Sequence, residues 1–160
     1  MAANVKSRAR AKRFSGFECQ FIDGAWRSGQ GEGRLADHNP YSGELLTEIP
    51  HANERDVDDA HAAAVKAQRA WAERLPSERS MIMRQAATVM EARHGEIVDW
   101  LIKEAGSTRI KAELEWAAVH AVMLEAAFAP YRVEGRILPS DVPGKECRVY
   151  SQPVGVVGVI

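Results

Sequence analysis

The stretch Val154-Gly-Val-Val-Gly-Val-Ile160 decides the fold class of this 160-residue chain. It is apolar at every position that carries a side chain, so both faces of an extended strand here would be apolar. A strand with one solvent face would instead alternate apolar and polar residues. Strands buried on both sides are typical of parallel sheets covered by helices. The stretch therefore predicts an α/β fold with a buried strand at residues 153–160.

That strand needs parallel neighbours, and each parallel connection takes a dozen or more residues. The earlier segments supply hairpins and helices but no second strand that is apolar throughout. We therefore expect an incomplete domain, or a domain that another chain completes. The stretch has no charge and no proline, so we also expect it to aggregate when it lacks partners.

Three helices are expected in the middle of the chain. The first begins after Asn53, because asparagine is a good N-cap residue and four acids follow where the helix dipole favours them. It ends before Pro76. The second covers about residues 77–105 and the third residues 109–128, and a glycine and a proline follow their respective ends.

Each expected helix carries an apolar stripe at spacings of three and four residues, which predicts one buried face. Met90 and Trp100 widen the second stripe. The stripes consist of Val57, Ala60, Ala64, Ala67 and Trp71 in the first helix, Ile82, Ala86, Val89, Ile97 and Leu101 in the second, and Ile110, Leu114, Ala117, Ala121, Leu124 and Phe128 in the third.

Hairpin signals lie before the helices. Residues 19–26 are expected to form a strand that runs into a turn at Asp23-Gly24, since both residues tolerate a positive φ. The glycines of residues 29–33 predict a flexible loop. They are not a dinucleotide fingerprint, because no helix follows and the third spacing is wrong. Residues 39–43 predict a turn, and residues 44–49 a short strand.

After the helices the pattern changes to period two. Residues 133–138 and 146–152 are each expected to form a strand, with a turn at Pro139 to Gly144 between them.

Composition and charge limit the possible functions. The chain is 46% hydrophobic with a net charge of -1, which is ordinary for a globular protein and gives no field that favours nucleic acid. Residues 1–16 form a basic arm that is expected to be solvated and disordered, although a role at a nucleic acid or a membrane surface is the alternative. No apolar run approaches the roughly 20 residues that span a bilayer, so we expect no membrane contact. Nothing suggests export, so reduced thiols and a cytoplasmic location are expected. The arm's basic residues are Lys6, Arg8, Arg10, Lys12 and Arg13.

Neither cysteine has the surroundings expected of a nucleophile. Cys147 is expected in mid-strand between Glu146 and Arg148, whereas a reactive thiolate needs a helix N-terminus or a cationic pocket. Cys19 is no better placed. The five histidines form no H-x-x-x-H or H-E-x-x-H motif, so zinc is not indicated. We therefore predict no catalytic and no cofactor-binding residue.

Five strings in this order resemble the aldehyde dehydrogenase superfamily over residues 17–160. The region from Ser107 to Trp116 is most similar to members that act on aromatic aldehydes such as benzaldehyde or vanillin. The strings are Phe21-Ile-Asp-Gly-Ala-Trp26, Asn39-Pro-Tyr-Ser-Gly-Glu44, Ala70-Trp71 with Pro76-Ser-Glu-Arg79, Glu104-Ala-Gly-Ser-Thr-Arg-Ile-Lys111, and Gln152-Pro-Val-Gly-Val-Val-Gly-Val-Ile160.

The resemblance implies the N-terminal part of the aldehyde dehydrogenase fold. Residues 17–132, a hairpin and three helices, would begin the cofactor-binding domain. Residues 133–152 would form a hairpin of the kind that joins subunits into oligomers. Residues 153–160 would be the first strand of the nucleotide-binding sheet.

The resemblance also implies oxidation of an aldehyde to its acid, with NAD or NADP as hydride acceptor. A cysteine thiolate attacks the carbonyl, an asparagine helps to hold the oxyanion, and a glutamate activates water. In the family all three follow the position of Ile160. The chain alone is therefore expected to be inactive and to bind no cofactor, with an oligomerisation fragment or one half of a split enzyme as alternatives.

A structural monovalent cation is a further implication of the resemblance. Members of the family often bind one through a carboxylate at the place of Glu104 and through backbone near Asp37 and His38. An ordinary exposed acid at a helix end is the other reading of Glu104.

Overall fold

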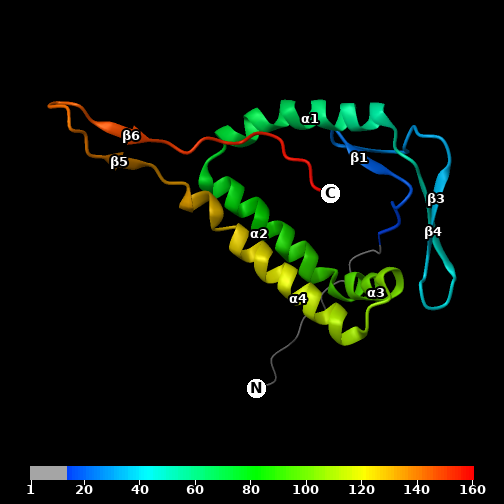
Figure 1. Cartoon of the computed structure of the whole chain (residues 1–160). Helices are drawn as coiled ribbons and strands as arrows, with labels where there is room; N and C mark the ends of the chain where they lie inside the picture. The colour runs from blue at the N-terminus through cyan, green and yellow to red at the C-terminus, as the bar shows by residue number, and fades with distance from the viewer. Residues whose placement is uncertain (1–13) are drawn as a thin grey trace, which may run out of the picture.

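The structure is a computed structural model that describes residues 14–160 (Figure 1). Residues 1–13, which hold the charges of the expected basic arm, lie outside the described part. The α/β fold class is confirmed. In chain order the elements are β1 (Gln20–Ile22), β2 (Ala25–Arg27), β3 (Arg34–His38), β4 (Leu45–Pro50), α1 (Glu54–Glu73), α2 (Pro76–Ala92), α3 (His94–Ala105), α4 (Arg109–Ala126), the 3-10 helix η1 (Ala129–Arg132), β5 (Arg136–Leu138) and β6 (Cys147–Val149).

The hairpin β1–β2 confirms the turn predicted at Asp23-Gly24. Both residues have a positive φ, 49° and 77°, and the strands pair in antiparallel register with Phe21 opposite Trp26. The second hairpin, β3–β4, was predicted only in its second strand. The sequence does not indicate strand β3, because Arg-Leu-Ala-Asp-His contains no β-branched residue and no Phe, Tyr or Trp.

The glycine-rich segment between these hairpins is confirmed as a loop and lies against the residues that follow β4, while its flexibility stays a prediction. The Gly31 amide donates a 2.9 Å hydrogen bond to the His51 carbonyl. A Cβ on Gly29 would overlap that same carbonyl oxygen, and a Cβ on Gly31 would come within 2.7 Å of the Ala52 carbonyl oxygen. Glycine is therefore needed here for a close approach of two backbones.

Asp56 joins the N-terminal hairpins to α1. Its buried carboxylate accepts hydrogen bonds from the Gln30 amide (2.8 Å), the Gln30 side chain (2.9 Å), the Asn53 amide (3.1 Å) and Arg27 Nη2 (3.1 Å). Asn53 in turn accepts from the Asp56 amide, which completes a capping box and confirms the predicted helix start. The hydrogen bond from the Gln30 amide is the main cause that lowers the pKa of Asp56, and burial acts in the opposite direction.

The single long helix predicted at residues 77–105 is wrong, because the chain breaks at Arg93 into α2 and α3. Arg93 leaves the helical conformation, with φ -105° and ψ 13°. Its guanidinium returns to α3 and binds both carboxylate oxygens of Glu96 at 2.8 and 2.9 Å. The break lets α3 turn away from α2 while both helices still contact α4 (Figure 1).

The core lies where α4 packs against α2 and α3. Its fully buried apolar side chains are mostly small: Ala87 on α2, Val98 on α3, Ala112 on α4 and Ala127 just after α4. The stripes predicted for these helices are on other faces. Val89 remains 57% exposed, Leu114 67% and Ile110 75%. The prediction failed because these helices are apolar on more than one side, and the close contact selects the small residues.

The first helix shows the same departure from its predicted stripe. Val57 is 63% exposed and Trp71 is also exposed, while Ala60 and Ala64 are half-buried. Its contact with the rest of the described chain is mainly with β1 and through Asp56.

The hairpin predicted at residues 133–152 is confirmed, although its strands are shorter than expected. β5 and β6 pair antiparallel, with Ile137 opposite Arg148, and the hairpin extends away from the helices (Figure 1). Residues 151–160 pair with no strand of the described chain, and Val154 and Val159 are more than nine-tenths exposed. A strand needs a neighbour to supply its hydrogen bonds, so the place of residues 153–160 in a sheet stays a prediction.

Asp56→Asn should lower the stability of the chain at pH 7, because the neutral amide cannot satisfy four donors. The folded pKa of Asp56 lies below its unfolded value of about 3.9, so the advantage of the wild type is fully present above that pH. It is lost as the pH falls through the folded pKa. Urea unfolding from pH 7 to pH 3 measures this. Asp59→Asn, which removes only the exposed partner of Arg27, is the control; equal effects of the two variants would contradict the role of Asp56.

Ala112→Leu should destabilise the chain by about 1–3 kcal/mol, because the buried contact has no room for the larger side chain. Ala117→Leu on the exposed side of α4 is the matched control and should change the free energy of unfolding by less than about 0.5 kcal/mol. Thermal unfolding compares them. A larger loss of stability with Ala117→Leu than with Ala112→Leu would instead support the buried stripe predicted from the sequence.

Candidate functional site

An open apolar groove of about 780 Å³ lies between the N-terminal segment and the helices. Its aromatic wall is supplied by residues ahead of α1, and its opposite side by α2, α3 and α4. Phe14, Phe17 and Trp26 line the first side, and Val89, Met90, Ile97, Trp100, Leu101 and Met123 line the second.

Most of the apolar stripe predicted for the second helix lines this groove. Ala86, Val89, Ile97 and Leu101 share one surface, as their spacing predicts, and Met90 and Trp100 widen it. The surface does not enter the core formed with α4. It lines the open groove instead, so the sequence grouped these residues correctly but assigned them the wrong partner.

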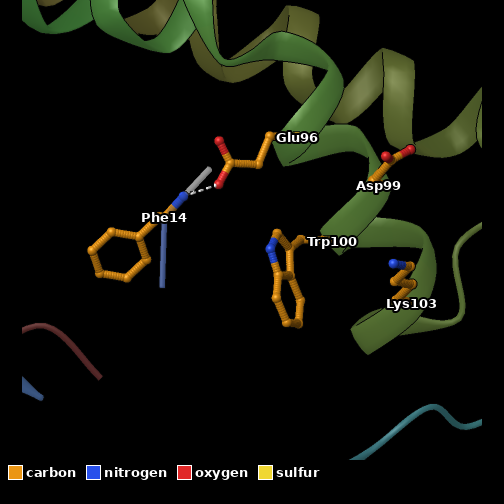
Figure 2. A pocket seen from close by; sticks show the side chains of 5 residues that line it. All are labelled: Phe14, Glu96, Asp99, Trp100 and Lys103. Atoms are coloured by element: carbon orange, nitrogen blue, oxygen red, sulfur yellow. Dashed lines mark hydrogen bonds between the residues drawn. The ribbon is translucent and has the colours of Figure 1, made fainter. Parts of the chain in front are cut away.

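A smaller pocket of about 130 Å³ adjoins the groove at α3 (Figure 2). Glu96, Asp99, Trp100 and Lys103 belong to α3, and Phe14 lies beside them with its amide toward Glu96 and its ring turned away (Figure 2). The Phe14 amide donates a 2.7 Å hydrogen bond to Glu96 Oε1. The hydrogen bonds that the Arg93 guanidinium donates to Glu96 are the main cause that raises the pKa of Arg93.

Glu104 is exposed near the end of α3 and lines the same groove. The next turn of chain lies against the β3–β4 hairpin, because a Cβ on Gly106 would be 3.0 Å from Pro40 Cγ. The structure thus brings the end of α3 close to the turn that follows Asp37 and His38. Among the described residues no three His, Cys, Asp or Glu side chains form a cluster that could hold a metal. The cation site at Glu104 stays a prediction.

The two thiols lie apart from this groove. Cys147 is half-buried on β6 opposite Leu138, and Cys19 is half-buried just before β1. Arg148, the cation beside Cys147, binds Glu146 through its Nε at 2.9 Å, and this hydrogen bond is the main cause that raises the pKa of Arg148. The guanidinium is therefore committed to a carboxylate rather than to the neighbouring thiol.

A polar and aromatic cluster between α3 and α4 was not predicted. His94 Nε2 lies 2.7 Å from Glu113 Oε2, and the Trp116 ring stands between the rings of His94 and His120, with centroids 4.3 and 4.9 Å away. The four-residue spacing of Trp116 and His120 on one helix could have indicated that these two rings are neighbours. The pair of His94 and Glu113 depends on tertiary packing. Both side chains are about two-fifths exposed, so the pair adds at most about 1 kcal/mol.

Residues 26–160 match the model of the aldehyde dehydrogenase family. The chain belongs to this family. In the described residues no helix is long and apolar enough to cross a membrane.

Curated members of the family align with most of the chain. A vanillin dehydrogenase of Corynebacterium glutamicum is 46% identical over 149 residues, which are 92% of this chain and 31% of that protein. A benzaldehyde dehydrogenase of Bacillus subtilis is 41% identical over 88% of this chain and 29% of that protein. The chain thus spans under a third of the length of these relatives and matches their N-terminal part.

Solved structures agree with these alignments. An NAD-dependent benzaldehyde dehydrogenase from Corynebacterium glutamicum superposes with a TM-score of 0.80 at 44% identity, over 86% of this chain and 30% of that one. A salicylaldehyde dehydrogenase from Pseudomonas putida, complexed with salicylaldehyde, superposes with a TM-score of 0.79 at 29% identity, over 84% of this chain and 28% of that one. The predicted family and N-terminal fold are confirmed.

Both thiols should react with an aromatic disulfide reagent no faster than a cysteine in an unfolded peptide at the same pH, because both are half-buried and Arg148, the cation next to Cys147, is bound to Glu146. Cys19→Ser and Cys147→Ser variants assign the two rates. A thiol about tenfold faster than the peptide would contradict this reading of the site.

Proposed function

We propose that this chain forms the N-terminal part of a cytoplasmic NAD- or NADP-dependent dehydrogenase that oxidises an aromatic aldehyde to its carboxylic acid. The identity to a vanillin and a benzaldehyde dehydrogenase supports the substrate class. The salicylaldehyde complex of a more distant relative agrees with it. Activity is a property of the whole enzyme, and the part assigned to this chain is structural.

The groove is the observation that carries this assignment. Part of this surface is exposed: Val89 on α2 is 57% exposed, whereas Ile97 and Leu101 on α3 are half-buried. Residues 153–160 are apolar too, and all of them except Val156 are exposed. A sheet that begins with this strand and packs on the helices would bury both surfaces, as helices and sheets do in α/β folds.

The glycine-rich loop of residues 29–33 does not fit the phosphates of a nucleotide. The glycine-rich loop of residues 29–33 leads into β3 rather than into a helix. The backbone of residues 51–52 occupies the space beside Gly29 and Gly31. A phosphate would find no helix N-terminus there, and the Gln30 and Gly31 amides already donate to Asp56 and to the His51 carbonyl. When bound elsewhere in the enzyme, NAD or NADP would supply the hydride acceptor, and we assign no step of that transfer to this chain.

The β5–β6 hairpin supports a further role in oligomer formation. Its strands extend away from the helices, and Ile137 is 71% exposed although it is a β-branched apolar residue (Figure 1). Each strand has one edge without a partner among the described residues. Such an edge can accept a strand of another subunit, which is also how the chain would act as an interaction fragment.

A chimaera tests the proposed function. Residues 17–160 replace the matching segment of the Corynebacterium glutamicum vanillin dehydrogenase, and we expect NAD reduction with vanillin or benzaldehyde within about tenfold of the parent, since the exchange leaves the reacting groups unchanged. Cys147→Ser should leave that rate unchanged. Val89→Asp should abolish it by charging the groove, whereas Val89→Ile should not.

The isolated 160-residue chain is the second arm of this experiment. It should reduce neither NAD nor NADP with benzaldehyde, and its circular dichroism should survive Val89→Asp because the side chain is exposed there. An isolated chain that turns over at an ordinary enzymatic rate would overturn the structural assignment. A folded chimaera without aldehyde oxidation would count against the function. Co-purification of the inactive chain with the intact dehydrogenase would favour the interaction fragment.

A further inference from the structure

The apolar stripe predicted for the third helix lies on the outer side of α4, away from the buried Ala112, and the proposed function does not use it. Its large side chains are left in solvent: Ile110 is 75% exposed, Leu114 67% and Leu124 43%. We propose that this stripe is the seam of an antiparallel helix pair, in which α4 packs against α4 of a second copy of the chain. The inference goes beyond the proposed function, because it involves neither the groove nor the β5–β6 hairpin.

The spacing of the seam selects a helix as its partner. Its members follow one another at intervals of four, three, four and three residues, which is a repeat of 3.5 residues. This is the repeat at which two helices keep one face in contact while they supercoil. A strand presents a side chain to one face at every second residue and would not stay in step with the seam. The members are Ile110, Leu114, Ala117, Ala121 and Leu124.

The order of side-chain sizes along the seam fits a pair of identical helices. Ala117 and Ala121 occupy its middle, and both are exposed. If Ala117 lies opposite Ala121 of the second copy, Leu114 lies opposite Leu124 at either end. The small residues let the two helix axes approach closely, and the leucines pack on both sides of them. This arrangement is the same for both copies, as a twofold interface requires.

Charges beside the seam decide the direction of the pair. Lys111 and Glu125 each follow a seam residue by one position, and their side chains are 59% and 61% exposed. In the antiparallel pair Lys111 lies beside Glu125 of the second copy, and this contact occurs at both ends of the seam. In a parallel pair Lys111 would instead face a residue five positions earlier, Gly106 of the second copy, which carries no charge. Charge complementarity therefore favours the antiparallel direction.

The partners that these two charges already have are compatible with the pair. Lys111 Nζ lies 2.6 Å from Glu115 Oε1, and Arg132 Nη1 lies 2.5 Å from Glu125 Oε1. All four side chains are at least two-fifths exposed, so these ion pairs are weak and either charge can be shared. Each end of the seam would then carry four charges of alternating sign, two from each copy.

Cross-linking near the twofold axis tests the proposal on the whole 160-residue chain. Ala118→Cys, in a Cys19→Ser and Cys147→Ser background, places a thiol beside the axis in each copy, since it follows Ala117. A short bismaleimide should join at least about tenfold more of this variant than of Val119→Cys, because only the first site holds two thiols at a high effective concentration. Val119 is 52% exposed and lies on the side of α4 opposite the seam. Equal cross-linking at the two sites would overturn the proposal.

Charge reversal tests the direction of the pair. Lys111→Glu and Glu125→Lys should each raise the Kd of the dimer about tenfold in sedimentation equilibrium, because each variant sets like charges against one another at both ends. The double variant should restore the Kd, since it forms the same ion pairs with their signs exchanged. A double variant that associates no better than the single ones would contradict an antiparallel pair.

Variants of the seam and of other apolar surfaces separate this pair from other contacts. Leu114→Glu should abolish the dimer but keep the circular dichroism of the monomer, in which Leu114 is exposed, whereas Leu114→Met should keep both. Ile137→Asp in the hairpin and Val159→Asp near the C-terminus should leave the cross-linking of Ala118→Cys unchanged. Loss of cross-linking with either of them would place the association elsewhere and overturn the proposal.

A chain that stays monomeric at every concentration would also overturn the proposal, because the seam would then be covered from within one subunit. Neither result alters the expected activity of the chimaera, whose parent supplies the reacting groups. Failure of the helix pair and failure of the proposed function are therefore separate outcomes.

Discussion

The close packing of α4 against α2 and α3 determines what the other apolar surfaces of the chain can do. At this contact the side chains of Ala87, Val98 and Ala112 are at most 1% exposed. Their small size allows the helices to approach one another closely. Because this face is taken, the larger side chains on the other faces need cover from elsewhere. The open groove and the exposed side of α4 both follow from that choice of contact.

The sequence predicts local structure well where one residue controls it. Asn53 caps α1, Asp23 and Gly24 take the positive φ values of a tight turn, and Gly106 ends α3 with φ 62°. Each depends on the chemistry of one or two neighbouring residues. Periodicity also found the groove surface, because Ala86, Val89, Ile97 and Leu101 do share a face despite the break between their helices.

What the sequence could not predict depends on pairs of residues far apart in the chain. Glu96 binds the Phe14 amide from 82 residues away, and Glu113 meets His94 across two helices. In each case the sequence around either residue alone predicts only an ordinary exposed side chain. The choice between two apolar faces of one helix is of the same kind, since it depends on the residues that the neighbouring helix presents.

The described charges show why this part of the enzyme is assigned a structural role. Arg27 is bound to Asp56, Arg93 to Glu96 and Arg148 to Glu146, so each of these guanidinium groups already faces a carboxylate. A catalytic site needs donors that remain free until charge develops on the reacting atoms. Here Arg27 holds the first hairpin on α1, Arg93 binds Glu96 at the break between α2 and α3, and Arg148 binds Glu146 beside β6. These ion pairs stabilise the folded chain, which suits a scaffold that positions the reacting groups of another part of the fold.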